Sequence, residues 1–228
     1  FIRFKIMYDI NVESTSSDAI KQNLDGIKKI SKERILIELL KILDIQNFLN
    51  INENSNLREI FSMIFPEFLY LNRLKRLKKV YKQSELNRDI LLAVLLIDEK
   101  DNHEYFAHKY NISSKTKEYL SKLATNLREI KSNKNFLEKD LPKNIYIFGK
   151  DHLINLNLID YASRSKFKIS DLNKIIKRIL KFNLPKFPFD GNYLIKRGMK
   201  EGELLGKVLK IIEGEWLKND FKISNDRV

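Results

Sequence analysis

Carboxylates come closest together in a run that follows the most apolar segment of the chain. In Asp98-Glu99-Lys100-Asp101, Glu99 and Asp101 have the alternate spacing with which a β-strand would point two carboxylates to one side. Such a pair could hold divalent metal ions on a phosphate group. That chemistry also needs a glycine-rich loop to cradle the phosphates, and no such loop stands beside this run. We therefore expect an acidic helix end that leads into a polar loop.

The three histidines are the other candidates for metal binding or proton transfer. His103 and His108 are five positions apart, which misses the one-turn spacing that would point both at one metal from a helix face, and His152 is remote. Solvated or capping roles are therefore expected, with no metal site. The sequence contains no cysteine, which excludes a disulfide framework, thiolate catalysis and cysteine-ligated zinc, and favours a cytoplasmic location.

The charge of the chain indicates a polyanionic partner. Lysine and arginine number 43 against 30 acidic residues, giving a formal net charge of +13, and an excess of this size attracts nucleic acid. After Pro66, basic residues are interleaved with leucines and Tyr81, so a helix there would turn most of its charges outward. Its basic residues are Arg73, Lys75, Arg76, Lys78, Lys79 and Lys82. We expect Arg73, Lys75, Arg76 and Lys79 to contact RNA phosphates. A compositional bias toward lysine is the alternative explanation.

The hydrophobic pattern predicts an all-α protein. Few glycines and prolines, and many Leu, Ile, Lys and Glu, favour long helices over sheets. Ser31 and Ser113 are suited to cap helices, Pro66 ends one, and the nearly continuous apolar segment 87–97 predicts a helix buried on most sides. Residues 145–148 could form a short strand, but Gly149 and the pattern after it favour a helix.

The longest apolar stretch, residues 90–97, is far shorter than the roughly 20 residues that cross a bilayer. We therefore expect no membrane span. The chain begins with Phe1 rather than methionine, and its first residues do not have the pattern of a leader sequence. We expect it to be a fragment of a longer protein.

Short motifs at the two ends of the chain occur in a particular order. Phe1-Ile-Arg-Phe4 precedes Ile30-Ser-Lys-Glu-Arg-Ile35, and the segment 187–216 holds most of the seven glycines around two apolar patterns. In this order the motifs resemble the neck and closing segment of bacterial class II tRNA nucleotidyltransferases and their poly(A) polymerase relatives. The residues that fall on the neck motifs are Arg3, Ser31, Glu33 and Arg34. The ends of the chain match this family more closely than the middle.

The resemblance implies a role in binding and positioning tRNA or another RNA. In this family a catalytic head transfers the nucleotide with Mg²⁺ and CTP or ATP, and it would lie before Phe1. No catalytic residue and no cofactor are therefore expected in this chain, and the head could be encoded separately, removed or lost. The tail of the family meets the elbow of tRNA, which implies phosphate contacts for Lys196, Arg197 and Lys200. The resemblance does not separate CCA addition from poly(A) synthesis.

The expected organisation is a multi-helix neck, body and tail. Pro66 and the run Leu184-Pro-Lys-Phe-Pro188 interrupt the helical pattern, so we expect neck-like helices over 1–66, a helical body over 67–184 and a tail over 185–228. Within the tail, Gly206 falls in the middle of the last helix, which indicates a close helix contact or a close approach of the backbone to RNA, and we favour the helix contact. The alternative function is a non-catalytic helical remnant or interaction protein that binds polyanions without specificity.

Overall fold

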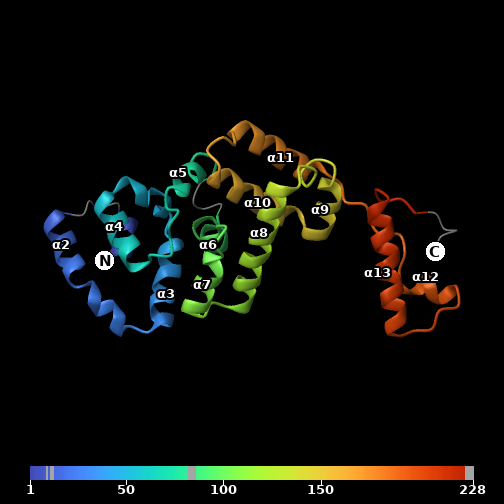
Figure 1. Ribbon diagram of the computed structural model, residues 1–228, viewed down its shortest axis with the longest axis horizontal. Coiled ribbons are helices and arrows are strands. Elements are labelled where there is room, and N and C mark those ends of the chain that lie inside the picture. The colour runs from blue at the N-terminus through green and yellow to red at the C-terminus, as the bar shows by residue number, and fades with distance from the viewer. Residues whose placement is uncertain (9, 11–12, 82–85, 224–228) are drawn as a thin grey trace.

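The computed structural model describes residues 1–228 except 9, 11–12, 82–85 and 224–228. Within these residues the regular secondary structure consists of helices alone, which confirms the all-α class. The helices follow one another along an elongated arch, with the N-terminal helices at one end and a separate helical tail at the other (Figure 1). No helix among the described residues is long and apolar enough to cross a membrane.

The N-terminal helices form a group whose ends are set by local capping. They are α1 (Ile2–Met7), α2 (Ser14–Gln22), the 3₁₀ helix η1 (Leu24–Lys29), α3 (Lys32–Leu43), the 3₁₀ helix η2 (Phe48–Glu53) and α4 (Ser55–Ile64). Ser31 caps α3, its hydroxyl oxygen accepting from the Arg34 amide at 3.4 Å, as its position predicts. The last helix of the group ends just before Pro66, which is also as predicted.

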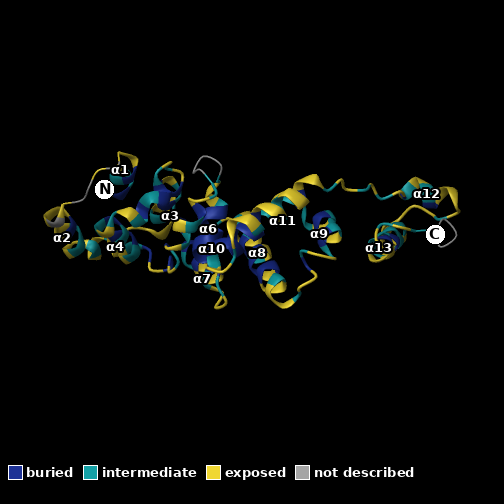
Figure 2. Ribbon diagram, turned by 90° about the horizontal axis from the view of Figure 1, so that it is seen from above, coloured by how far each residue is buried: buried dark blue, intermediate teal, exposed yellow. Residues whose placement is uncertain are grey.

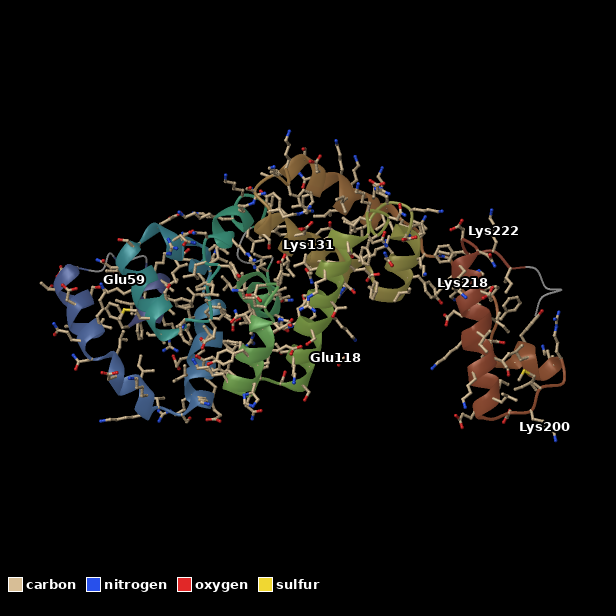
Figure 3. All side chains as sticks on the ribbon, viewed as in Figure 1. Glu59, Glu118, Lys131, Lys200, Lys218 and Lys222 are labelled. Atoms are coloured by element: carbon tan, nitrogen blue, oxygen red, sulfur yellow. The ribbon has the colours of Figure 1, made fainter. Side chains whose placement is uncertain are left out.

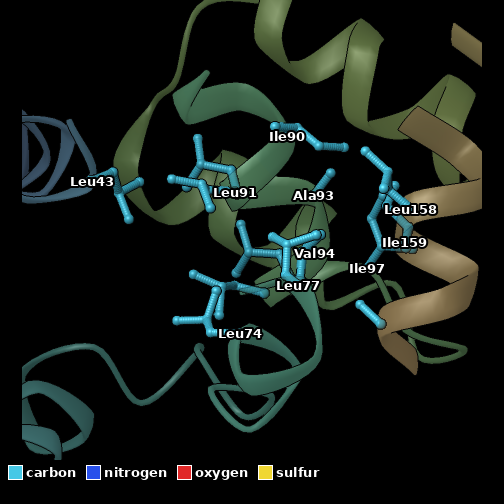
Figure 4. Close-up of a cluster of buried hydrophobic side chains, with 14 of the residues drawn as sticks. Leu43, Leu74, Leu77, Ile90, Leu91, Ala93, Val94, Ile97, Leu158 and Ile159 are labelled. Carbon is cyan, nitrogen blue, oxygen red and sulfur yellow. The ribbon is translucent and has the colours of Figure 1, made fainter. Parts of the chain in front are cut away.

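The middle of the molecule is built around one fully buried helix. Its helices are α5 (Arg73–Leu77), α6 (Arg88–Leu96), α7 (Asn102–Tyr110), α8 (Ser114–Ser132), α9 (Leu141–Phe148), α10 (Lys150–Ser163) and α11 (Ile169–Lys181). Every residue from Ile90 to Ile97 is at most 2% exposed, which confirms the predicted buried helix. Leucine and isoleucine side chains of α3, α5 and α10 pack around α6 (Figure 4). The helix predicted over 145–148 is also present, as the end of α9.

The predicted basic helix after Pro66 is much shorter than its pattern suggests. We expected a helix that carried basic residues from Arg73 to Lys82, but α5 spans only Arg73–Leu77, and Lys82 lies outside the described residues. Turns flank it on the N-terminal side, where the Asn52 side-chain amide donates to the Leu71 carbonyl at 2.7 Å. Contacts with the core thus replace the regular helix that its periodicity predicts.

The tail contains α12 (Gly191–Lys196) and α13 (Glu203–Lys218). Gly198 and Gly202, between these helices, have positive φ values of 95° and 147°, which side-chain-bearing residues rarely adopt. The expected packing contact at Gly206 is wrong, because a Cβ added there would meet no atom within 4 Å. The close approach in the tail is at Gly191, where an added Cβ would lie 3.2 Å from Leu205 Cδ2.

Two hydrophobic clusters divide the chain unequally. The larger runs through α1 to α11 and joins the neck-like helices to the body, whereas the smaller contains Phe189, Leu194 and Ile212 of the tail. Figure 2 shows buried residues concentrated in the middle of the arch and exposed chain leading to the tail. The boundary expected at residue 66 therefore separates groups of helices that share one core.

Candidate RNA-binding surface

Arg73, the first of the predicted phosphate-binding residues, holds the end of α6. Its Nη1 atom donates to the carbonyl oxygens of Val94 and Ile97, at 2.8 Å each. Its guanidinium carbon lies 3.8 Å from the centre of the Tyr70 ring. Val94 lies in the last turn of α6 and Ile97 is its C-cap, where carbonyls have no partner within the helix. Burial lowers the pKa of Arg73, against the opposing effects of Tyr70 and then Asp98.

Arg76 fastens α5 to the segment between α10 and α11. Its Nε donates to the Tyr161 carbonyl at 2.9 Å, and its two terminal nitrogens donate to the carbonyls of Ser165 at 3.2 Å and Phe167 at 2.5 Å. The guanidinium also stacks on Tyr161, 4.3 Å from the ring centre. The planar fork of arginine can satisfy several carbonyls at once, which a lysine cannot do. Arg76 is thus a tertiary link over a long sequence separation.

The outward direction predicted for Arg73 and Arg76 is therefore wrong. Both guanidinium groups are engaged by backbone carbonyls of neighbouring elements, and a phosphate would have to compete with these bonds. The two arginines lie on the inner side of α5, between the leucines that face the core. Lys75 and Lys79 are exposed, as predicted, while exposed Lys78 pairs with Glu53 at 2.5 Å.

The bonds of Arg76 bring two groups of exposed lysines close to each other. Because Arg76 binds the backbone of residues 165 and 167, the exposed lysines of α5 lie beside those that lead into α11. Helix α11 then carries further exposed lysines along the upper edge of the arch (Figure 3). We call this set the α5–α11 basic surface, and its residues are Lys75, Lys79, Lys166, Lys168, Lys174, Lys177 and Lys181.

Most of these ammonium groups are not neutralised by a neighbouring acid. Among the described residues, Lys174 alone in this set has an ion pair, with Asp171 at 3.9 Å. Long-range attraction to a polyanion is strongest where positive charges lie together without paired acids. The lysines of α11 were visible in the sequence as the polar side of an amphipathic helix. Only their position beside α5, which depends on folding, identifies them as part of one surface.

The three predicted tail residues form a second, separate group. Lys196, Arg197 and Lys200 are exposed at the end of α12 and in the turn after it. The Arg197 guanidinium carbon lies 4.6 Å from the centre of the Tyr193 ring. Lys200 lies at the lower end of the tail, whereas α11 follows the upper edge of the arch (Figure 3). The structure therefore does not bring the tail residues together with those of α5.

The residues of the neck motif have structural roles. Arg3 pairs with Glu38 of α3 at 3.3 Å and so joins α1 to α3. The pKa of exposed Glu33 is lowered, first by a hydrogen bond from its own backbone amide and then by one from the Ser31 hydroxyl. Arg34 is exposed and lines an apolar cavity of about 480 Å³ between the N-terminal helices. The motif thus builds the start of α3 beside this cavity.

The acidic run forms a turn, as its sequence predicts. Asp98 Oδ1 accepts from the backbone amides of Lys100 and Asn102 at 2.9 and 3.1 Å. Glu99 pairs with Lys131 at 3.0 Å, and Asp101 pairs with Arg128. These carboxylates connect the turn after α6 to α8.

The solvated or capping role expected for His103 is wrong, because this side chain is 2% exposed and burial lowers its pKa. Its Nδ1 atom has no hydrogen-bond partner among the described residues. His103 brings a ring nitrogen within 4.8 Å of carboxylate oxygens of Asp101 and Glu104. The pairing of Asp101 with Arg128 places a positive charge beside this group, which disfavours a second cation.

Comparisons with known proteins bear on this arrangement. Residues 9–71 match a family described as "probable RNA and SrmB-binding site of polymerase A". A CCA-adding enzyme of Staphylococcus haemolyticus is 23% identical over 95% of this chain and 52% of its own length. The mitochondrial CCA tRNA nucleotidyltransferase 1 of Danio rerio is 22% identical over 95% of this chain and 49% of its own length. The chain thus spans about half the length of these relatives.

The fold itself has a counterpart among solved structures. The crystal structure of the Bacillus stearothermophilus CCA-adding enzyme in complex with CTP superposes with a TM-score of 0.61. The match covers 96% of this chain and 56% of that one, at 18% identity. Together with the sequence matches, it confirms the resemblance to the C-terminal region of CCA-adding enzymes.

Proposed function

We propose that this chain, which matches part of CCA-adding enzymes along nearly its whole length, is the RNA-binding and positioning portion of a nucleotidyltransferase that adds nucleotides to RNA 3′ ends. Transfer RNA is the proposed substrate, as the names of its relatives suggest. The α5–α11 basic surface is the observation in the structure that supports this proposal most strongly. It gives phosphates a row of lysines that are mostly unpaired.

Catalysis is proposed to reside in a head domain. Two-metal transfer needs carboxylates that hold divalent ions on the triphosphate. The carboxylates of the run at 98–101 do not fit this task, because Glu99 and Asp101 are engaged by Lys131 and Arg128. Mg²⁺ and CTP or ATP would therefore be bound by the head. We expect the isolated chain to incorporate no CMP or AMP into a tRNA that lacks its 3′ end.

The N-terminal helices offer a surface on which such a head could dock. Phe1, Phe4 and Tyr8 of the first helical segment are 45%, 53% and 64% exposed. Ile37 of α3 is 52% exposed, and the apolar cavity beside it is open to solvent. Exposed apolar clusters of this kind mark interaction sites. We propose that a catalytic head contacts this face, either as part of the same protein or as a separately encoded partner.

The cytoplasmic location that the lack of cysteine favours stays a prediction.

The experiment that tests the proposal compares two RNAs of equal length. A module shaped for tRNA binds folded tRNA more tightly than a linear RNA at the same salt concentration. A protein that attracts polyanions without specificity binds both equally, since phosphate charge alone then determines affinity. Filter binding of the full chain at several salt concentrations measures this difference. Equal affinities at every concentration would favour the alternative, a helical remnant or interaction protein.

A further inference from the structure

A cavity of about 510 Å³ opens between α8 and the junction of α9 with α10. Its volume lies in the range of about 300–1,000 Å³ that is typical of small-molecule pockets. The α8 side chains at its wall are Ser121, Lys122, Thr125 and Asn126, and Phe148 and His152 face them. None of these residues belongs to the α5–α11 basic surface. The cavity therefore needs an explanation of its own.

Aromatic rings form a stacked column that ends at this cavity. Phe136 and Phe148 have ring centres 6.2 Å apart and planes inclined by 24°. Phe148 and His152 continue the column at 5.5 Å and 28°. Phe136 is only 1% exposed, whereas Phe148 and His152 line the cavity. The column thus leads from the core to a site where one more flat ring could be added.

The polar groups of the cavity are arranged around His152. Asn126 is 5% exposed, and its Nδ2 donates to His152 Nε2 over 2.9 Å. Burial, and then the charge of Lys122, lowers the pKa of His152, which favours the neutral ring. A neutral ring that accepts at Nε2 carries its proton on Nδ1. Among the described residues, the only side-chain hydrogen bond of Asn126 and His152 is the one that joins them, so a ligand in the cavity could use the Nδ1–H of His152 as a donor and Asn126 Oδ1 as an acceptor.

The chemistry that fits such a site is that of a nucleobase. A base presents a flat face for stacking and an edge that carries hydrogen-bond donors and acceptors. Adenine, for example, carries an amino group that could donate to Asn126 Oδ1 and ring nitrogens that could accept from His152. A purely apolar ligand would leave both polar groups without partners, at a cost. A charged ligand would find the Lys122 ammonium already paired with Glu118 at 2.7 Å.

The cavity also lies close to the end of the α5–α11 basic surface. Lys150 Nζ donates to the Leu180 carbonyl at 2.8 Å, which ties the first turn of α10, near His152, to the last turn of α11. Lys181 is exposed in that last turn, and Lys177 is exposed just before it. Figure 3 places Glu118, at the rim of the cavity, on the side of α8 that faces the tail. An RNA strand whose phosphates bind the lysines at the end of α11 could therefore place one of its bases in the cavity.

We propose that this cavity binds one unpaired nucleobase, stacked on the Phe148–His152 column and hydrogen-bonded to Asn126 and His152. The proposal rests on the RNA-binding function proposed above. It adds to that function a contact that reads a base, in contrast to the phosphate contacts of the lysines. Each stacked base contributes about 5- to 150-fold in affinity, the fold-change that corresponds to the measured range for base–aromatic stacking.

The test uses the full chain and two probes that differ only in their bases. An adenine RNA hexamer and an abasic hexamer of the same length carry the same phosphates. Wild type should bind the adenine hexamer at least about 5-fold more tightly. Thr125→Trp fills the cavity from its exposed rim and His152→Ala removes the end of the column, so both should abolish the difference. Thr125→Ala, which leaves the cavity open, is the matched control and should retain it. Fluorescence anisotropy at fixed salt gives the affinities.

The outcomes separate this proposal from the proposed function. If the two hexamers bind wild type equally, or if the preference for adenine survives both Thr125→Trp and His152→Ala, the nucleobase site is wrong. RNA binding through the lysines stands in that case, provided that the abasic hexamer binds with a steep salt dependence. If neither hexamer nor tRNA binds, the proposed function itself fails. Titration with AMP identifies the source of the base: AMP binding that Thr125→Trp removes indicates free nucleotide, and binding of the hexamer alone indicates RNA.

Discussion

The body and the tail are held together by different kinds of contact. The body surrounds α6 with a large aliphatic core, whereas the tail buries few hydrophobic side chains of its own and meets the body through aromatic rings. Trp216 lies 5.3 Å from both Tyr146 of α9 and Phe187, and 4.8 Å from Phe221, measured between ring centres. The Tyr146 hydroxyl donates to Glu213 at 2.5 Å. The position of the tail therefore depends on a few aromatic contacts, while the body presents a fixed surface.

Replacement of Trp216 should have the largest effect, and it should be confined to the tail. This side chain is 2% exposed, and truncation of a buried tryptophan to alanine costs about 3–5 kcal/mol. Trp216→Ala should therefore loosen α12 and α13 and leave the body folded. Limited proteolysis with mass spectrometry should show new cleavage after residue 183 and a protected body. Cleavage throughout the chain would show that tail and body unfold as one unit.

Replacement of Arg76 should lower the stability of the body. Arg76→Gln removes donors to three carbonyls and the contact with Tyr161, so the free energy of unfolding should fall by about 2–3 kcal/mol. Urea unfolding followed by far-UV circular dichroism measures this loss. The double variant Lys75→Gln, Lys79→Gln is the matched comparison on the same helix. It should keep the unfolding midpoint of wild type and weaken RNA binding instead.

Acidification should affect the body more than the tail. Burial is the main cause of the lowered pKa of both His103 and His152, and both lie in the body, while no histidine follows residue 152. These histidines take up protons more readily in the unfolded chain than in the folded one. The body therefore loses stability as the pH falls below the unperturbed histidine pKa of about 6.5. Between pH 7.5 and 5.5 the urea midpoint measured by circular dichroism should fall more than that measured by fluorescence of Trp216.

The control for the pH experiment removes both titrating groups. His103→Gln with His152→Gln should make the difference between the two midpoints independent of pH over this range. A wild-type difference that persists in the double variant would assign the pH dependence to other groups. One candidate is Asp160, a carboxyl whose pKa burial raises.

The smallest expected effect is a gain in the stability of the tail. Gly206 lies within α13, and a Cβ added there meets open space. Gly206→Ala should therefore stabilise the tail by about 0.5–1 kcal/mol, because alanine loses less backbone entropy in a helix. The unfolding midpoint measured by Trp216 fluorescence should rise. An unchanged midpoint would contradict the predicted gain in the stability of the tail. Gly191→Ala is the contrasting variant and should stabilise the tail less, since its Cβ would lie 3.2 Å from Leu205 Cδ2, which would have to shift.

Much of the fold follows from local patterns. The cap at Ser31, the end of α4 before Pro66 and the buried helix α6 depend on neighbouring residues, and each is found where the sequence predicts it. The length of α5 is different, because Arg73 and Arg76 bind carbonyls that are far away in the sequence. A periodic pattern indicates which residues could face outward. It does not show which basic side chains will donate to backbone carbonyls that are distant in the sequence.

The candidate site shows the same limit. Lys75 and Lys79 are exposed as expected, but their neighbours on the basic surface come from α11 and the segment before it, more than 80 residues later in the sequence. The bonds of Arg76 create that neighbourhood. The cavity beside His152 likewise combines α8 with α9 and α10. Side chains brought together by tertiary packing leave no periodic signal in a single sequence.

The salt dependence of tRNA binding tests the central claim most directly. The test variant replaces Lys166, Lys168, Lys174 and Lys177 by glutamine, and the control variant replaces Lys100, Lys115, Lys117 and Lys134, which are exposed elsewhere. Both lose four positive charges. Each phosphate contact contributes about 0.7–0.9 to the slope of log affinity against log salt. The slope should become shallower by about 3 in the test variant and by less than about 1 in the control. Equal changes in the two variants would contradict an RNA-binding surface on α5 and α11.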